Sequence, residues 1–157
     1  MKPSNAMMAE PSAMDPYMQE AIAEAKKGLS EGGIPIGSVL VRGKTILGRG
    51  HNRRVQEEDP VIHAEIDCLR SAGRIGTYRD CVLYSTLMPC YLCAGAAVQF
   101  GIRKVVAGES KTFAGARAFM EEHSIEVIDL ELPECTAMMQ EFIRKNPRLW
   151  NEDIGEL

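Results

Sequence analysis

The first regular element of the chain is predicted directly after Asp15. Asp15-Pro16 is typical of a helix start, because an aspartate caps free N–H groups and proline fits the first turn. Apolar residues then recur at helical spacing until Gly32-Gly33 ends the helix. The apolar positions on this helix are Met18, Ala21, Ile22, Ala25 and Leu29.

Beyond Gly33 the pattern changes to short apolar runs that predict strands. Residues 36–42 and 45–50 form a hairpin pattern around Gly43-Lys44, and helices and strands then alternate. We expect further strands at 81–86, 104–107 and 125–130, and further helices at 59–72, 89–100, 116–122 and from Pro133 onward. A hairpin followed by alternation predicts an α/β fold, a three-layer α/β/α sandwich around a mixed five-stranded sheet.

No internal repeat and no linker interrupts residues 15–157, so we expect them to form a single domain. Residues 1–14 are expected to be a cloning remnant or a disordered N-terminus, because Ser4-Asn5-Ala6 before Met7 and Met8 is typical of a cloning remnant. They lack the apolar core of a secretory signal. We exclude this segment from the fold prediction.

Composition narrows the classes of function. The chain has 157 residues, 45% of them hydrophobic, and a formal net charge of -4, so neither intrinsic disorder nor a diffuse basic surface for nucleic acid is predicted. No apolar run approaches the ~20 residues of a membrane span, so no membrane partner is expected. Five cysteines are an odd number, which indicates reduced thiols and a cytoplasmic location.

Two short motifs carry candidate chemistry: His63-Ala64-Glu65 and Pro89-Cys90-Tyr91-Leu92-Cys93. Each alone is weak evidence. The first could be an ordinary helix start with a surface glutamate. The second could be a redox pair, or half of a structural zinc site with four cysteines.

Together the two motifs predict a catalytic metal site. Cys90 and Cys93 share a helix face in a first turn, where the helix dipole favours thiolates. His63 adds a nitrogen ligand from the start of another helix. Three protein ligands leave a fourth tetrahedral position for water, as in catalytic zinc sites. Glu65 beside such a water is predicted to act as the proton shuttle, whereas a purely structural zinc module has no need of it.

The H-x-E…P-C-x-x-C arrangement is the known signature of zinc-dependent nucleobase deaminases. On these residues the chain resembles the zinc-dependent cytidine/cytosine deaminase superfamily. Over nearly its whole length it is similar to the fungal-type cytosine deaminases. The matching stretches are Glu31 to Gly37, Leu47 to Asn52, His63 to Glu65, Leu83 to Leu87, Pro89 to Cys93 and Trp150 to Gly155.

The resemblance implies a cytidine-deaminase-like fold, one catalytic Zn²⁺ per chain and a homodimer. It implies hydrolytic deamination of a free nucleobase, first of all cytosine to uracil and ammonia in pyrimidine salvage. Isocytosine or guanine remain alternative small-molecule substrates. A tRNA adenosine deaminase shares the motif but needs basic phosphate contacts, and the C-terminal segment after Arg148 is acidic.

The resemblance also implies substrate contacts. Asn52 would hydrogen-bond the base, the backbone N–H of Ala64 would hold its carbonyl oxygen, and Asp153 would hydrogen-bond it from the C-terminal segment. Phe113 and Trp150 would stack on the base or close over it. From the residues alone, Asn52 could merely end a strand, Trp150 could anchor a helix and Asp153 could be solvated.

Two positions depart from the fungal pattern. Ala64 replaces a glycine but keeps its N–H, so this change is expected to be harmless. Met88 replaces a small polar residue and is expected to reshape the pocket wall near the metal, which bears on base preference. His51 is predicted to be a structural neighbour of Asn52 rather than a ligand, and His123 to lie at the surface.

Overall fold

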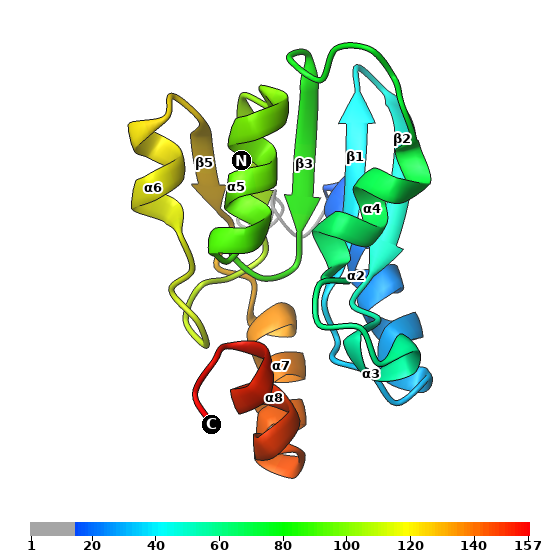
Figure 1. The fold of residues 1–157 in the computed structure, drawn as a ribbon, viewed down its shortest axis with the longest axis vertical. Helices are drawn as coiled ribbons and strands as arrows, with labels where there is room; N and C mark the ends of the chain where they lie inside the picture. Colours follow the sequence, from blue (N-terminus) through cyan, green and yellow to red (C-terminus); the bar gives the residue numbers. More distant parts are fainter. Residues whose placement is uncertain (1–14) are drawn as a thin grey trace, which may run out of the picture.

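The structure is a computed structural model that describes residues 15–157, so the expectation for residues 1–14 lies outside it (Figure 1). The helices are α2 (Pro16–Ser30), α3 (Arg54–Glu57), α4 (Ala64–Ala72), α5 (Tyr91–Phe100), α6 (Arg117–Glu122), α7 (Pro133–Lys145) and α8 (Pro147–Asp153). The strands are β1 (Gly37–Arg42), β2 (Thr45–His51), β3 (Cys81–Ser85), β4 (Lys104–Ala107) and β5 (Glu126–Asp129). Within residues 15–157 no helix has the length and apolar character that crossing a bilayer requires.

The five strands form one mixed sheet in the order β2-β1-β3-β4-β5. Strand β1 runs antiparallel to β2 and to β3, whereas β3, β4 and β5 are parallel to one another. Strands β2 and β3 therefore end at the same edge of the sheet. Asn52 follows β2 there, and the segment leading to Cys90 follows β3.

Helices cover both faces of this sheet, which confirms the predicted three-layer α/β/α sandwich (Figure 1). On one face Leu83 of β3 packs in a cluster with Cys68 of α4 and Ala97 of α5. On the other face Val39 of β1 packs with Ile22 of α2. Burial of apolar side chains on both faces provides the main stabilisation of such a layered fold.

Strand β2 and helix α4 approach closely because β2 carries glycines where they meet. A Cβ atom at Gly48 would lie 2.6 Å from the carbonyl oxygen of Cys68, and one at Gly50 would lie 2.5 Å from its backbone nitrogen. Any side chain at these positions would push the helix away. The glycines thus bring the start of α4 next to the end of β2.

The second predicted helix begins later than expected, so its start at Asp59-Pro60 was wrong. The Asp59 carboxylate accepts a hydrogen bond from the backbone N–H of Val61 at 3.0 Å, which closes a local turn. Helix α4 begins only at Ala64, with His63 as its N-cap. The His63 side chain makes no capping hydrogen bond to the helix, which leaves its ring nitrogens for other contacts.

Two helices near the site were not predicted. Helix α3 is a four-residue turn that follows Asn52. Helix α8 begins at Pro147 after Asn146 and carries Trp150 and Asp153, which sequence reasoning left in an undefined C-terminal segment. Helix α8 packs beside the lower end of α7 in Figure 1.

Candidate active site

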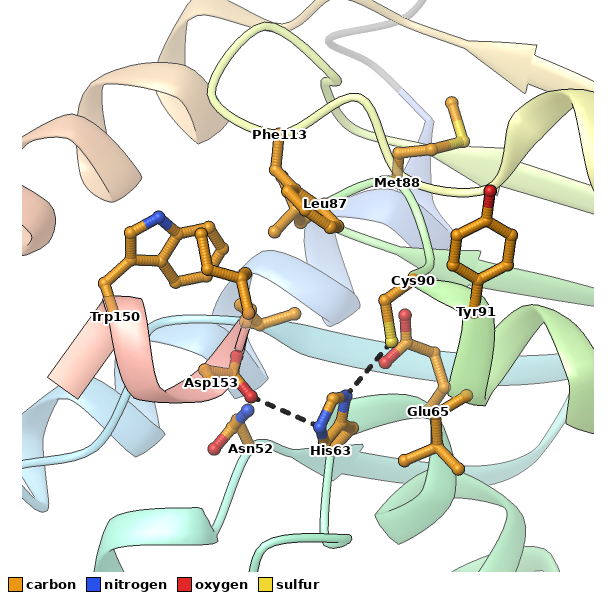
Figure 2. A pocket seen from close by; sticks show the side chains of 13 residues that line it. Asn52, His63, Glu65, Leu87, Met88, Cys90, Tyr91, Phe113, Trp150 and Asp153 are labelled. Carbon is orange, nitrogen blue, oxygen red and sulfur yellow. Dashed lines mark hydrogen bonds and ion pairs between the residues drawn. The ribbon is translucent and has the colours of Figure 1, made fainter. Parts of the chain in front are cut away.

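A cavity of about 300 Å³ lies where strands β2 and β3 end (Figure 2). Its volume is at the lower end of the range for small-molecule sites. Most of its wall is apolar, with a few polar groups that converge on one side. The predicted site residues that line it are Asn52, His63, Glu65, Cys90, Phe113, Trp150 and Asp153.

The three predicted metal ligands are brought together at this cavity. One ligand atom from each of His63, Cys90 and Cys93 lies within 4.8 Å of the other two. Nδ1 of His63 lies 3.5 Å from the sulfur of Cys90. One imidazole nitrogen and two sulfurs are a donor set that suits tetrahedral zinc, and the residues therefore fit the ion that the motif implies.

Helix geometry explains how both sulfurs reach one point. Cys90 is the N-cap of α5, and Cys93 is the third residue of that helix. Free backbone N–H groups at a helix start favour negative charge on a thiolate. The sequence placed both cysteines in the first turn, and the structure has Cys90 one position earlier, at the cap.

Hydrogen bonds among the three residues shift the pKa of each of them. The hydrogen bond from the Cys93 thiol, aided by His63, lowers the pKa of Cys90 to about 4 although burial opposes this. The same bond and burial raise the pKa of Cys93. Burial disfavours the charged form of His63, but contacts with Asp153 and Cys90 outweigh it and raise the pKa to about 10. Zinc binding would replace these protons, since its ligands are thiolates and neutral imidazole.

Glu65 is a buried carboxyl group next to the ligand cluster. It is the second residue of α4 and only 4% exposed. The Ser85 hydroxyl, at the end of β3, lies 3.0 Å from its Oε2 and can donate a hydrogen bond to it. Burial and the charge of Cys90 raise the pKa of Glu65. A carboxyl group with a raised pKa can both accept and return a proton.

Asn52 presents a hydrogen-bond donor to the cavity. Its side-chain oxygen accepts from the backbone N–H of Arg54 at 3.0 Å, which fixes the orientation of the amide. Its Nδ2 atom is buried and has no partner among residues 15–157. Figure 2 shows this nitrogen on the side of the cavity. A buried donor without a partner is costly, so a ligand with an acceptor atom would satisfy it.

Aromatic side chains from distant segments cover the other side of the cavity. The rings of Phe113 and Trp150 meet edge to face, with centroids 5.8 Å apart and planes at 89°. Trp150 is buried, so it packs against the core and lines the cavity at once. These two rings form an apolar wall that suits a planar heterocycle.

Asp153 contacts His63 of the candidate ligand cluster and is shielded from solvent. Its Oδ1 lies 3.2 Å from Nε2 of His63 and 3.2 Å from Nε of Arg54. The carboxylate thus contacts Nε2 of the imidazole, whereas Nδ1 faces Cys90. Metal-binding histidines commonly have such an outer partner, which fixes their orientation.

The remaining predicted positions differ in how closely they approach the cavity. Ala64 is the buried first residue of α4, where its N–H has no acceptor within the helix. Met88 lines part of the wall but is 1% exposed, and Figure 2 shows its thioether turned away from His63. His51 is fully buried beside Asn52, and His123 is exposed, as predicted.

Sequence reasoning missed the two residues that hold site carboxylates. Ser85 had a usable signal, because it lies at the end of a predicted strand just before the cysteine motif. No sequence signal pointed to Arg54, since its contact with Asp153 joins segments about a hundred residues apart. Such contacts depend on tertiary structure alone.

Comparison with known proteins agrees with this geometry. The family model of the cytidine and deoxycytidylate deaminase zinc-binding region matches residues 11–109. A cytosine deaminase of Candida albicans is 45% identical over 142 residues, which cover 88% of this chain and 95% of that protein. A tRNA-specific adenosine deaminase of Bacillus subtilis is 40% identical over 141 residues, 82% of this chain and 88% of that one.

A solved structure with a related fold is a guanine deaminase from Nitrosomonas europaea. It superposes with a TM-score of 0.69 at 20% identity, covering 80% of this chain and 82% of that one. At this identity the likeness shows the fold alone. The family match spans more than half of the chain and includes both motifs of the site. The chain therefore belongs to the cytidine and deoxycytidylate deaminase family of zinc-dependent aminohydrolases.

Proposed function

We propose that this protein hydrolyses the exocyclic amino group of free cytosine, giving uracil and ammonia. One observation carries the proposal: His63, Cys90 and Cys93 converge beside the buried Glu65, in a cavity that the rings of Phe113 and Trp150 close. The similarity to the Candida albicans cytosine deaminase supports cytosine as the base.

The proposed metal ligands are His63, Cys90 and Cys93, which would hold one zinc ion per chain. When bound there, zinc supplies a Lewis acid that lowers the pKa of water to about 7. Glu65 would take one proton from water and deliver it to ring nitrogen N3, which makes carbon C4 electrophilic enough for the water oxygen to bond to it. Glu65 would then carry the proton of the new C4 hydroxyl to the amino group, so that the C4–N bond breaks, ammonia leaves and a C4 carbonyl remains. Its raised pKa suits both steps.

The other site residues hold the base. We infer that Asn52 donates its unpartnered N–H to the ring, and that the free backbone N–H of Ala64 binds the C2 carbonyl oxygen. Phe113 and Trp150 would enclose the ring, and Asp153 would bind the substrate amino group while it contacts His63. A cavity of about 300 Å³ closed by α8 suits a base without ribose.

A panel of amino bases tests this substrate assignment. Ammonia release is measured for cytosine, isocytosine and guanine, and inosine formation for a tRNA with a wobble adenosine, with zinc content determined on the same sample. We expect turnover of cytosine far above the rest. Turnover of guanine or tRNA in place of cytosine would refute the assignment while leaving the deaminase chemistry intact.

We further propose that the enzyme is a cytoplasmic homodimer in pyrimidine salvage. All five cysteines are free thiols, which suits a reducing compartment. Helix α5 is apolar yet leaves Tyr91, Leu92 and Phe100 exposed, which suits a face covered by a second copy. Light scattering coupled to gel filtration measures the mass, and a monomeric mass would contradict the dimer.

A further inference from the structure

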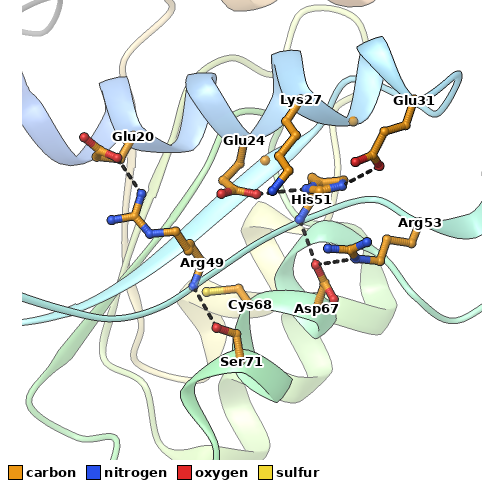
Figure 3. A network of polar contacts seen from close by, with 12 residues as sticks. Glu20, Glu24, Lys27, Glu31, Arg49, His51, Arg53, Asp67, Cys68 and Ser71 are labelled. Atoms are coloured by element: carbon orange, nitrogen blue, oxygen red, sulfur yellow. Dashed lines mark hydrogen bonds and ion pairs between the residues drawn. The ribbon is translucent and has the colours of Figure 1, made fainter. Parts of the chain in front are cut away.

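A fully buried histidine, His51, joins helix α2 to the end of strand β2 (Figure 3). It precedes Asn52 directly in the chain. Helix α2 passes over its ring at Gly28, where a Cβ atom would lie 3.0 Å from the ring carbon Cδ2. The ring is therefore enclosed between helix and strand, and its hydrogen bonds must be made inside the protein.

Both ring nitrogens of His51 face carboxylate oxygens. Nδ1 lies 2.8 Å from Oε1 of Glu24, and Nε2 lies 2.9 Å from Oε1 of Glu31. A neutral imidazole has one N–H, so its other nitrogen would direct a lone pair at a carboxylate oxygen. With both carboxylates ionised, the two contacts are favourable when each nitrogen carries a proton and donates a charge-assisted hydrogen bond.

The charges around the ring favour the same state. Gln56 donates to Glu31 at 3.1 Å, and the hydrogen bonds of His51 and Gln56 lower the pKa of Glu31, which keeps it ionised. On the opposite side, Asp67 of α4 accepts the backbone N–H of His51 at 3.0 Å and Nε of Arg53 at 2.9 Å.

Three carboxylates thus surround His51, two from α2 and its cap and one from α4. Arg53 pairs with the carboxylate of Asp67 on α4. A positive imidazolium reduces the remaining excess of negative charge. A neutral ring would leave one of its nitrogens facing a carboxylate oxygen with no proton between them.

The contacts of His51 and Asp67 determine where Asn52 lies. The residue before Asn52 and the residue after it are both bound to the same Asp67 carboxylate. The backbone N–H of Asn52 donates to the carbonyl of Ile36 at 3.0 Å. A shift of His51 would therefore move the Asn52 amide whose free N–H faces the cavity.

We propose that doubly protonated His51 is a positioning residue, which ties α2 to the end of β2 and thereby holds the Asn52 amide in place for the substrate. The inference rests on the proposed function in that Asn52 contacts the base. The Glu65 carboxyl contacts Ser85 of β3 and not His51, so loss of this tie weakens substrate binding and leaves proton transfer intact. KM then rises while kcat is retained.

Heteronuclear NMR of the zinc-loaded protein tests the first half of the proposal without any substrate. At neutral pH both ring nitrogens of His51 are expected to carry a proton, and the Asn52 side-chain amide signal to shift in a His51→Gln variant. A His51 ring with a single proton would overturn the proposal, whether or not cytosine is the substrate.

Kinetics test the second half. His51→Gln keeps at most one of the two carboxylate contacts, and its KM is expected to rise about tenfold, the weight of one hydrogen bond, with kcat nearly unchanged. The matched control is Arg49→Gln, which breaks an ion pair between Arg49 and Glu20 that joins the same strand to the same helix at an exposed position. Its KM is expected to stay at the parent value.

Equal KM changes in His51→Gln and Arg49→Gln, or a loss of kcat alone, would overturn the proposal. Should His51→Gln not fold, the double variant Glu24→Gln and Glu31→Gln replaces it, because it keeps hydrogen-bonding groups on both sides of the ring. There we expect a singly protonated ring and a raised KM, and a parent KM contradicts the proposal. If the parent protein does not deaminate cytosine, the proposed function fails and the NMR result alone decides the role of His51.

Discussion

Glu65 is buried and has a hydrogen-bonding neighbour that was not expected, the Ser85 hydroxyl. Burial raises its pKa above that of a free carboxyl group, so its protonated form is easier to reach than in water. This is the property that a proton shuttle needs, because it must change protonation state twice in one turnover. Glu65→Gln keeps the shape of the side chain and removes this ability.

We expect Glu65→Gln to lower kcat by about 10²–10⁴-fold, the usual contribution of a general acid–base group. Zinc content should stay at the parent value, because the glutamate is not one of the proposed ligands. Ammonia release and elemental analysis measure the two quantities. Ser85→Ala is the matched variant, which keeps the carboxylate but loosens it, and its kcat should fall by less. Parent turnover in Glu65→Gln would exclude the shuttle.

Cys90 differs from the other cysteines in its ionisation. Its pKa is about 4, whereas burial raises the pKa of Cys68 and of Cys135 to about 12. Thiolates, not thiols, react with alkylating agents. A pH of about 6 is above the pKa of Cys90, so this thiol is ionised. The same pH is far below the pKa of Cys68 and of Cys135, which stay protonated.

In metal-stripped protein we therefore expect iodoacetamide to modify Cys90 first at that pH, with Cys68 and Cys135 unmodified. Peptide mass mapping identifies the site. Zinc added beforehand should protect Cys90, and magnesium, which prefers oxygen ligands, should not. Modification of Cys68 or Cys135 ahead of Cys90 would contradict this assignment of the thiolate.

At the scale of elements, Asp153 links helix α8 to His63, one of the proposed zinc ligands. The carboxylate lies 3.2 Å from Nε2 of His63 and from Nε of Arg54. We expect Asp153→Asn to weaken zinc affinity by about 10–100-fold, the usual effect of losing an outer partner of a ligand histidine. Competition with a chromophoric chelator measures the affinity without reference to turnover.

The matched control for Asp153 is its neighbour on α8. The side chain of Glu152 is half exposed and only reaches 4.0 Å from Arg54, so Glu152→Gln should leave zinc affinity unchanged. Arg54→Gln should lie between the two variants. Equal affinities in Asp153→Asn and Glu152→Gln would show that Asp153 does not support His63.

The elements could be predicted where a regular period or a strong helix signal was present. Helix α2, all five strands and the helix after Pro89 follow from apolar spacing, proline starts and glycine stops. The helix start predicted at Asp59-Pro60 was wrong because the same two residues also close a turn. Helix α8 has the proline start that α2 has, but its seven residues are too few to show a period.

That His63, Cys90 and Cys93 come together was predictable for a different reason. The spacing of Cys90 and Cys93 determines how their sulfurs lie on one helix start, whatever the rest of the chain does. The partners of Asp153 and His51 were not predictable, because each contact joins helices or strands that only the folded sheet brings together. Side chains that come together within one helical turn can be predicted from sequence, whereas contacts between distant segments cannot.

At the scale of the whole molecule, the zinc site would connect parts of the fold that the sheet holds separately. His63 begins α4, Cys90 and Cys93 begin α5, and Asp153 adds the C-terminal helix α8. A ligand that binds only the folded state stabilises it by about 4 kcal/mol at a thousandfold excess over its Kd. For a chain of this size, each kcal/mol raises Tm by roughly 2–4 °C.

We therefore expect removal of zinc by a chelator to lower Tm by roughly 8–16 °C, and added zinc to restore it. Two cysteines make a matched test, because Cys93 and Cys135 are each 1% exposed and only Cys93 belongs to the proposed ligand set. By calorimetry, Cys93→Ser should lose most of the dependence of Tm on zinc, whereas Cys135→Ser should retain it despite a lower Tm. If both serine variants respond to zinc as the parent does, the ion is bound elsewhere and cannot link α4 to α5.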